Sequence, residues 1–530
     1  MFSRLYNRGE IRNQCSVIER GHDLCCTVWL GWRDSNPRMP GPKPGALPLG
    51  HIPSLIHVTK LSLLHCTLIT TITARCDTFI YMAKNRRKPI IRTANFEKII
   101  SGGQSLGAIT SEENANDIGK KIMAWGVLPG ETANILLTKN KSSYCEGIVH
   151  DPINENLLLT NENQRIEPKD SESYLSTSPW QIMNFSAEQF YKSALVEEAF
   201  EMQNIVLPFP IETWSNNKEF YYRNKIEYSF WYSNDTEKLD LAFFKRGSHN
   251  KIAINETSLA MPEITGLSKK ILKVLNENKI GGRDLKTLLI RANQQGETAW
   301  QLYVKEKNIL TNKLKNGLNE FNNGEVIFSN PKSPASVVTE KLFKTNDFKE
   351  LSDKIFDKTF SYKTEGFFQI NLPAYEKVLE DIKPFIEPNL PVLDLYSGVG
   401  TIGLSVASMN SLTLVEINPV AVDEMKSNIK KLKLERTAKA ILTPSENATE
   451  FIEQDQIVIL DPPRAGVHKL VIDKLLEEQP KTIIYLSCNP VTQARDIAPL
   501  LMNYSIEYHK GYNFFPRTPH IEHLVILRHL

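Results

Sequence analysis

The stretch "LPVLDLYSGVGTIGLSVAS", Leu390–Ser408, decides the fold of the C-terminal part of this 530-residue chain. An apolar run leads into a glycine-rich turn and a helix-forming run follows, which is the pattern of strand, tight turn and helix. Further strand-like runs follow between Leu412 and Arg528, and the earlier ones alternate with helical stretches. Strands that alternate with helices predict a doubly wound α/β sheet, which we expect over residues 366–530.

The glycine-rich turn indicates a bound cofactor. Gly398, Gly400 and Gly403 form the pattern G-x-G-x-x-G, which taken alone is a weak signal for a dinucleotide. Asp394 lies in the strand before the turn, where a pyrophosphate would meet an unfavourable negative charge. Glu416 ends the next strand, about 20 residues on, where an acid can bind a ribose diol. A cofactor with a ribose but no phosphate fits better, so S-adenosylmethionine is favoured over NAD.

A third strand end carries an acid and two prolines. In "IVILDPPRAGVHKLV", Asp461 follows an apolar run, and the prolines after it cannot continue a helix. This places a carboxylate at the edge of the sheet, beside the cofactor. Methyltransferases that act on amino groups use a similar Asn/Asp-Pro-Pro but follow it with an aromatic residue. Arg464 stands there instead, which counts against methylation of an amino group.

Cys488 follows the next strand, and Asn489-Pro490 forces a turn directly after it. A nucleophilic cysteine must be accessible and easily deprotonated, and a strand end in a cleft allows both. A lone cysteine is more often buried and inert, but this one leaves a sheet edge that already carries cofactor signals. Glu522, flanked by His520 and His523, begins an apolar terminal strand and is a candidate general base.

Composition sets the class of the chain. The chain is 41% hydrophobic and 23% charged with a net charge of +2, as in ordinary soluble globular proteins. No run approaches the roughly 18 apolar residues of a membrane helix, so we expect a cytoplasmic protein. Only two of the seven cysteines, Cys145 and Cys488, follow the first 80 residues. They form neither a disulfide framework nor a four-cysteine metal site.

The sequence divides into five segments. Residues 1–81 are Pro- and Gly-rich in part, and we expect a disordered leader or a spurious translation before Met82. Residues 90–156 combine short strand-like runs with Gly-Gly and Pro-Gly turns. They resemble an OB-like TRAM barrel, whose relatives contact RNA. Residues 157–213 are a linker and a helical run, and residues 214–365 are predicted to be a small α/β domain. Within it Tyr222, Arg223, Asn224 and Lys225 could face nucleic acid, or belong to an ordinary strand.

Five motifs together resemble the RNA uracil-5-methyltransferases that depend on S-adenosylmethionine. They are "GFFQIN" (Gly366–Asn371), "LDLYSGVGTIGL" (Leu393–Leu404), "LDPPRAG" (Leu460–Gly466), "SCNPVTQARD" (Ser487–Asp496) and "FPRTPHIE" (Phe515–Glu522). The motifs occur in the order of the family, and with the TRAM-like segment the resemblance covers about residues 90–530. It implies a Rossmann-like methyltransferase domain that follows the barrel and the small α/β domain.

The resemblance also implies roles for individual residues. Cys488 corresponds to the nucleophile that adds to carbon 6 of uracil, and Glu522 to the general base. The positions that correspond to cofactor contacts are Gln369, Tyr396, Gly398, Thr401, Glu416, Asn447 and Asp461. The implied partner is RNA, with 23S ribosomal RNA favoured and tRNA as the alternative, and we expect a monomer. A looped or flipped uridine is the expected target, since the base must leave its stack.

The chain departs from the family at one site. Many members with a TRAM domain hold an iron–sulfur cluster on four cysteines, whereas Asp170, Ser176 and Pro179 stand roughly where thiols are expected here. No iron–sulfur cluster is therefore expected. Three other readings remain: an NAD-dependent oxidoreductase, an amino-directed methyltransferase, and an RNA-binding protein without catalysis. The oxidoreductase would change the absorbance of nicotinamide, and the amino-directed methyltransferase would transfer methyl groups without a covalent RNA adduct. The RNA-binding protein would bind RNA without using the cofactor.

Overall fold

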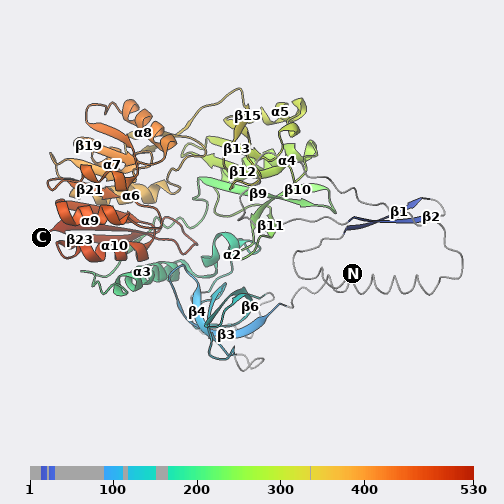
Figure 1. Cartoon of the computed structure of the whole chain (residues 1–530), viewed down its shortest axis with the longest axis horizontal. Helices are drawn as coiled ribbons and strands as arrows, with labels where there is room; N and C mark the ends of the chain where they lie inside the picture. Colours follow the sequence, from blue (N-terminus) through green and yellow to red (C-terminus); the bar gives the residue numbers. More distant parts are fainter. Residues whose placement is uncertain (1–13, 21–22, 30–88, 111–116, 151–164, 335) are drawn as a thin grey trace, which may run out of the picture. The chain divides into compact units, whose positions relative to one another are not determined.

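The computed structural model describes residues 14–20, 23–29, 89–110, 117–150, 165–334 and 336–530 of the chain (Figure 1). The chain divides into two units, Met1–Arg87 and Lys88–Leu530. In the first unit, β1 (Gln14–Arg20) and β2 (Asp23–Trp29) pair as an antiparallel hairpin. The prediction of a disordered or spurious segment over 1–81 otherwise falls outside the described residues.

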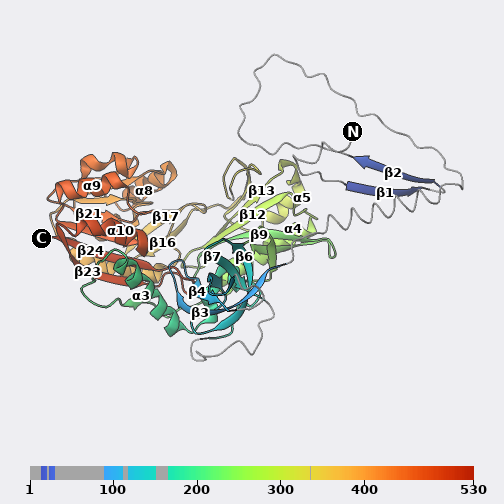
Figure 2. The same cartoon turned by 60° about the horizontal axis from the view of Figure 1, so that its bottom comes forward.

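The second unit begins with a closed five-stranded barrel in the order β3-β4-β5-β7-β6 (Figure 2). Its strands are β3 (Ile91–Ile99), β4 (Ser105–Ile109), β5 (Lys121–Trp125), β6 (Thr132–Asn140) and β7 (Tyr144–Val149). Burial alternates along β4 and β7, as the period-2 geometry of a strand requires. The inward side chains, among them Phe96, Ile122 and Ile135, form one small core. A small barrel therefore lies where the sequence analysis expected one.

Helices connect the barrel to the rest of the unit: α2 (Tyr174–Thr177), the 3-10 helix η4 (Pro179–Ile182) and α3 (Phe185–Glu201). The side chain of Asn184 caps α3, because its Oδ1 accepts a hydrogen bond of 2.8 Å from the N–H of Ala187. Val196 and Phe200 of this helix are fully buried in a core shared with the C-terminal sheet. Helix α3 thus packs on the same sheet that forms the candidate site.

A seven-stranded sheet follows in the order β11-β10-β9-β12-β13-β14-β15. Its strands are β9 (Lys225–Ser233), β10 (Lys238–Phe244), β11 (Lys251–Ile254), β12 (Leu285–Ala292), β13 (Thr298–Val304), β14 (Gly324–Phe328) and β15 (Glu340–Lys344). Helix α4 (Pro262–Glu277) packs on it, and α5 (Asn312–Leu318) packs on α4. The apolar stripe of α4, which includes Ile264 and Ile271, is buried against this sheet.

The C-terminal sheet has eight strands in the order β20-β19-β18-β21-β22-β24-β23-β8. They are β8 (Thr213–Trp214), β18 (Val392–Leu395), β19 (Leu412–Glu416), β20 (Ala438–Leu442), β21 (Ile457–Leu460), β22 (Thr482–Ser487), β23 (Tyr504–Tyr512) and β24 (Glu522–His529). The pairs from β20 to β22 are parallel, and β24 is antiparallel to β22 and β23. This arrangement is a Rossmann-like, doubly wound sheet.

Helices cover both faces of this sheet (Figure 1). They are α6 (Leu372–Ile382), α7 (Thr401–Val406), α8 (Pro419–Lys431), α9 (Lys469–Glu478) and α10 (Pro490–Leu500). Alternate residues of β21 belong to different cores: Ile457 packs with α6, α7 and α8, whereas Val458 packs with α9, α10 and α3. Strands buried on both faces explain the continuous apolar runs of the sequence.

The boundaries predicted for the small α/β domain, residues 214–365, differ from those in the structure at both ends. Strand β8 pairs with β23 and so belongs to the C-terminal sheet. The hairpin of β16 (Leu351–Ile355) and β17 (Lys358–Tyr362) buries Phe360 in the core of α6, α7 and α8. The sequence hid both contacts, because a two-residue strand and a short hairpin carry no periodic signal. Among the described residues, no helix has the length and apolar character needed to cross a membrane.

Candidate active site

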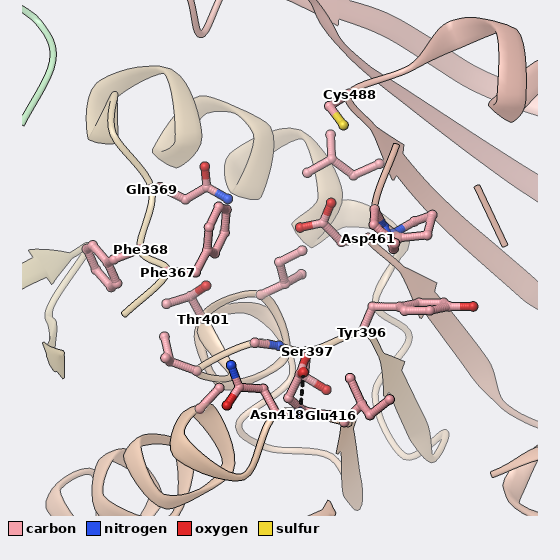
Figure 3. Close-up of a pocket in the computed structure, with 18 of the residues that line it drawn as sticks. Phe367, Phe368, Gln369, Tyr396, Ser397, Thr401, Glu416, Asn418, Asp461 and Cys488 are labelled. Atoms are coloured by element: carbon pink, nitrogen blue, oxygen red, sulfur yellow. Dashed lines mark hydrogen bonds between the residues drawn. The ribbon is translucent and has the colours of Figure 1, made fainter. Parts of the chain in front are cut away.

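A cavity of about 760 Å³ opens at the carboxyl ends of β18, β19, β21 and β22 (Figure 3). The chain leaves β18 for β19 on one side and returns to β21 on the other, so this edge is the switch point where doubly wound sheets bind ligands. Eight predicted residues line the cavity: Gln369, Tyr396, Gly398, Thr401, Glu416, Asp461, Cys488 and Glu522. Asn447 does not line it; its neighbours Ser445 and Glu446 do.

The glycine-rich turn leaves open space for a ligand. Gly398 has φ +57°, and a Cβ built on it would meet no atom within 4 Å. At Gly403 close packing requires glycine, because a Cβ there would lie 2.8 Å from Oδ2 of Asp394. The carboxylate of Glu416 accepts hydrogen bonds from the N–H groups of Gly398 (3.0 Å) and Asn418 (2.8 Å). The acid predicted to bind a ribose is thus fixed beside the turn.

Two carboxyl groups near the turn have raised pKa values. Burial raises the pKa of Asp394 to about 8, although the N–H of Gly403 donates a hydrogen bond of 2.9 Å to it. Oδ1 of Asp394 is buried and has no hydrogen-bond partner in the structure. Burial also raises the pKa of Asp461 to about 7. Such shifts in a cleft are typical of functional groups.

Cys488 lies directly after β22, where Asn489 caps α10 and donates a hydrogen bond of 2.8 Å to the carbonyl of Arg464. Burial, followed by the acids Glu522 and Asp461, raises the pKa of the Cys488 thiol to about 11, while Arg464 lowers it. Burial and the neighbouring acids thus favour the neutral thiol in the protein without RNA, whereas the sequence suggested an easily deprotonated one. Carboxyl groups surround this thiol, and a sequence alone does not reveal such neighbours.

Glu522 begins β24 and pairs with Tyr512 of β23. It is buried, and burial together with Asp461 holds the pKa of its carboxyl well above the usual range. His520 also lines the cavity, and its ring nitrogens lie 3.3 and 3.4 Å from Nη2 of Arg464. Burial and then the Arg464 charge lower the pKa of His520 to about 4, so its imidazole is neutral at neutral pH. His523 points elsewhere, because its Nδ1 lies 2.7 Å from Oε1 of Gln493 beneath α10.

Several residues at the site were not predicted individually. Phe367 lines the cavity with 69% of its surface exposed, an unusual position for a large aromatic side chain. The "GFFQIN" motif contains it, but two adjacent phenylalanines do not show which one is exposed. A second cavity, of about 280 Å³, touches Cys488, Arg464 and His520 and extends to Ser101 and Gly102 of the barrel. Only the folded chain brings these distant segments together.

Tyr222 and Asn224 do not lie on an exposed face that nucleic acid could contact. Both are buried: the hydroxyl of Tyr222 donates a hydrogen bond of 3.0 Å to the carbonyl of Pro516, and Nδ2 of Asn224 donates one of 3.0 Å to the carbonyl of Gln369. Lys225 donates similarly to the carbonyls of Glu365 and Gly366. This part of the central sheet instead holds segments of the candidate site.

The segment aligned with iron–sulfur members does not fit a thiolate-held cluster. The sequence has no cysteine between Cys145 and Cys488. Asp170 instead accepts hydrogen bonds from the N–H and hydroxyl of Ser258, both at 2.9 Å. Ser176 accepts one of 3.1 Å from the N–H of Arg246. In the part of the chain that the structure describes, no group of three or more acidic, histidine or cysteine side chains is placed to hold a metal ion.

The fold and this site define an S-adenosylmethionine-dependent methyltransferase. The model of the family described as tRNA (uracil-5-)-methyltransferase matches residues 190–530, more than half of the chain. The chain therefore belongs to the tRNA (uracil-5-)-methyltransferase family, and the resemblance found in the sequence is confirmed. It is an RNA (uracil-C5-)methyltransferase that uses S-adenosylmethionine.

Individual relatives agree with this assignment. A protein of Enterococcus faecalis named as an uncharacterized RNA methyltransferase is 27% identical over 421 residues, which cover 76% of this chain and 90% of that protein. One of Fusobacterium nucleatum with the same kind of name is 25% identical over 447 residues, covering 80% and 93%. The structure of Pyrococcus abyssi tRNA (uracil-54, C5)-methyltransferase with S-adenosyl-L-homocysteine has a TM-score of 0.64 at 20% identity, covering 82% of this chain and 100% of that one. That likeness shows the fold.

Proposed function

We propose that the protein forms 5-methyluridine in RNA through a covalent intermediate on Cys488, with Glu522 as the base. The observation that carries this proposal is the shared cavity: Cys488, Glu522 and Asp461 line the same space as the glycine-rich turn and Glu416. A nucleophile, a base and a cofactor site that meet in one cavity are what methylation of an unactivated pyrimidine carbon requires.

The cofactor site fits S-adenosylmethionine. Glu416 would bind the ribose hydroxyls, and the open space over Gly398 would admit the nucleoside close to the backbone. Tyr396, Thr401 and Gln369 line the same part of the structure and would complete the site. When bound, S-adenosylmethionine supplies an electrophilic methyl group.

Cys488 would make carbon 5 of uracil nucleophilic. Its sulfur adds to carbon 6, the electrons of the double bond move towards the carbonyl at carbon 4, and carbon 5 then attacks the methyl group. Because the free thiol has a pKa of about 11, the thiolate must form at the moment of addition, and Arg464 favours it electrostatically. The proton of the thiol passes to solvent water as the carbon–sulfur bond forms, and this is the one net proton that the whole methylation releases.

Glu522 would complete the reaction. After methyl transfer, carbon 5 still carries its hydrogen, and a carboxylate at Glu522 removes it as the carbon–sulfur bond breaks. The departing thiolate can take the proton that Glu522 has acquired, which restores both groups. The raised pKa of Glu522 makes its carboxylate a stronger base than an exposed glutamate, but it also favours the protonated carboxyl, so Glu522 must release its proton to solvent before it acts as the base.

The substrate that we propose is a flipped or looped uridine of 23S ribosomal RNA, with tRNA as the alternative that the name of the family supports. The barrel, which we interpret as a TRAM domain, would contact RNA near Ser101 and Gly102, where the second cavity opens towards Cys488. Incubation of wild-type protein with S-adenosylmethionine and either 23S ribosomal RNA or tRNA transcripts, followed by nucleoside mass spectrometry, identifies the substrate.

Two variants test the roles of the catalytic residues. Cys488→Ala should abolish 5-methyluridine formation and leave cofactor binding intact. Glu522→Gln should accumulate a covalent enzyme–RNA adduct, whereas the wild-type enzyme should not accumulate this adduct during turnover of ordinary RNA. Normal product release by Glu522→Gln would exclude Glu522 as the base, and a methylated amino group in the RNA would support an amino-directed reaction instead.

A further inference from the structure

The loop between β23 and β24 sets the position of the candidate base. Tyr512 and Glu522 are paired across these strands, so the loop of residues 513–521 begins and ends beside Glu522. The same loop carries His520, which lines the cavity. Any contact that holds the two ends of this loop therefore also holds the Glu522 carboxylate, which directly follows the loop.

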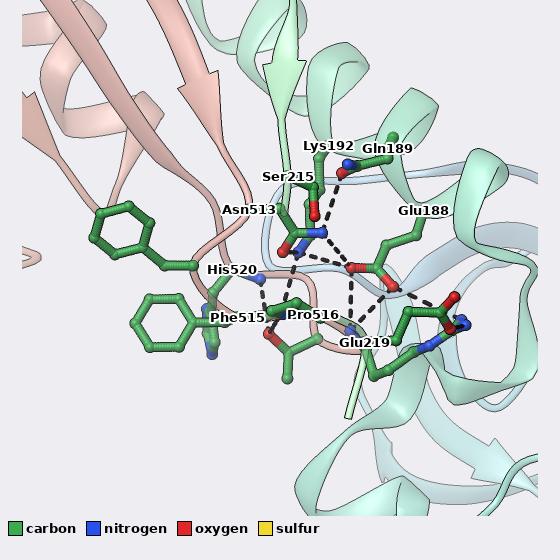
Figure 4. A network of polar contacts seen from close by, with 12 residues as sticks. Glu188, Gln189, Lys192, Ser215, Glu219, Asn513, Phe515, Pro516 and His520 are labelled. Carbon is green, nitrogen blue, oxygen red and sulfur yellow. Dashed lines mark hydrogen bonds and ion pairs between the residues drawn. The ribbon is translucent and has the colours of Figure 1, made fainter. Parts of the chain in front are cut away.

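Helix α3 presents a buried ion pair to this loop (Figure 4). The side chains of Glu188 and Lys192 are both 0% exposed, and Nζ of Lys192 lies 3.0 Å from Oε1 of Glu188. Lys192 also donates hydrogen bonds to Oδ1 of Asn513 and, at 3.1 Å, to the carbonyl of Phe515. One buried ammonium group thus joins the helix to two positions in the loop.

Glu188 binds the loop from the same helix face. Its Oε1 accepts a hydrogen bond of 2.8 Å from Nδ2 of Asn513, and its two oxygens lie 3.1 and 3.0 Å from the backbone N of Arg517. Arg517 has φ +67°, a left-handed conformation that is unfavourable for a residue with a Cβ. The carboxylate therefore stabilises the loop where its backbone is least favourable on its own.

Packing alone does not account for this pair. Burying two charges costs more than burying two apolar side chains of similar size, so such a pair is weak evidence for stability. The hydrogen-bonding groups that Glu188 and Lys192 use beyond each other belong to the loop that ends at Glu522. A requirement for one fixed loop conformation explains why charged residues stand there.

We propose that Glu188 and Lys192 are positioning residues that hold the loop, and with it Glu522, in place for removal of the proton from carbon 5. This inference rests on the proposed function, in which Glu522 is the base. It predicts a specific defect: addition of Cys488 and methyl transfer proceed, whereas the release of methylated RNA slows.

The test uses the full-length double variant Glu188→Gln/Lys192→Met, which removes both charges of the pair together. Arg517, whose Nη1 lies 3.8 Å from Glu188, keeps its ion pair with Glu219. With ordinary uridine RNA, we expect turnover to fall about 10- to 100-fold, as for misplacement of a catalytic group by about 1 Å. A denaturation-resistant enzyme–RNA adduct should accumulate. The rate of adduct formation with 5-fluorouridine RNA and the affinity for S-adenosylhomocysteine should stay within about twofold of wild type. The control Glu198→Gln breaks an ion pair between the same helix and Lys98 of the barrel, and should behave as wild type.

Three results would overturn the inference: wild-type turnover of the double variant, an equal loss of turnover and of 5-fluorouridine adduct formation, or the same defect in the control. If the double variant does not fold, Asn513→Ala decides, because it removes the side-chain hydrogen bonds by which this loop contacts Glu188 and Lys192 and leaves the ion pair itself in place. This variant should accumulate the same covalent adduct in a smaller amount, and absence of the adduct would contradict the inference. Failure of the wild-type protein to form any 5-fluorouridine adduct would instead contradict the proposed function itself.

Discussion

The carboxylate of Glu416 accepts a hydrogen bond of 3.0 Å from the backbone N–H of Gly398, and this contact joins the end of β19 to the turn after β18. The two strands are neighbours in the sheet, so the acid and the open turn line the same cavity. An acid fixed in this way does not need to reorganise before it binds a ribose.

Glu416→Ala should weaken the binding of S-adenosylhomocysteine about 10-fold or more, since a hydrogen bond to a charged group contributes about 1.5–3 kcal/mol. Isothermal titration calorimetry measures the effect. Asp423→Asn, an exposed change on α8, is the matched control and should leave the dissociation constant unchanged. Equal affinities for Glu416→Ala and wild type would show that the cofactor binds elsewhere.

Asn224→Ala should impair cofactor binding rather than RNA binding. Nδ2 of Asn224 donates to the carbonyl of Gln369, so its loss frees a segment that lines the cofactor cavity. We expect a several-fold weaker affinity for S-adenosylhomocysteine and an unchanged affinity for RNA in a filter-binding assay. Asn276→Ala, which removes hydrogen bonds to Leu239 within the central sheet, controls for loss of stability. The opposite pattern would restore the interpretation of this strand as an RNA contact.

The reactivity of Cys488 should depend on pH in an unusual range. Because the raised pKa of about 11 keeps the thiol protonated, its alkylation by iodoacetamide should be slow at pH 8 and rise through about pH 11. An ordinary thiol with a pKa of about 8.5 would already be half ionised near pH 8.5. Mass spectrometry of the Cys488 peptide follows the rate, with Cys488→Ser as the control. A midpoint below about 8 would show that burial and the neighbouring acids do not govern its ionisation.

Alanine substitutions at two adjacent glycines distinguish the stability cost of backbone strain from the cost of a steric clash. Gly102 and Gly103 have φ +91° and +90°, but a Cβ on Gly102 meets nothing within 4 Å, whereas one on Gly103 would lie 2.1 Å from Cβ of Pro519. Gly102→Ala should lower the free energy of unfolding by about 1 kcal/mol, and Gly103→Ala by about 1–3 kcal/mol more. Chemical denaturation measures both. Equal losses would mean that the barrel and the loop of Pro519 are not in contact.

The sequence allowed the strand ends of the site to be predicted, because each is marked locally. Glu416, Asp461 and Cys488 follow apolar runs, and alternation of strands and helices brings parallel strand ends to one edge. Glu522 was a candidate base from its position before an apolar terminal strand, and the resemblance then implied the same role; its strand runs antiparallel to β22, so the parallel-strand argument does not place it at this edge. Asn447 was placed in the cofactor site by the resemblance, but the cavity is lined by the residues just before it.

Other features are invisible before the chain folds. Lys192 and Asn513 are 321 residues apart, and no local pattern relates them. Tyr222 and Asn224 lie where aromatic and polar residues alternate, which suits both an RNA surface and a buried strand end. The high pKa of Cys488 arises first from burial and then from Glu522 and Asp461, which approach it from other strands. Long-range contacts of this kind determine chemistry that residue identity alone leaves open.

The central claim is covalent catalysis by Cys488, and RNA that contains 5-fluorouridine tests it most directly. Fluorine at carbon 5 cannot leave as a proton, so the enzyme should stall as a methylated, denaturation-resistant adduct when S-adenosylmethionine is present. We predict that digestion and mass spectrometry locate the modified nucleotide on the peptide that contains Cys488, and that Cys488→Ala forms no adduct. Methylation of ordinary RNA by a wild-type protein that forms no adduct with 5-fluorouridine RNA would contradict this account.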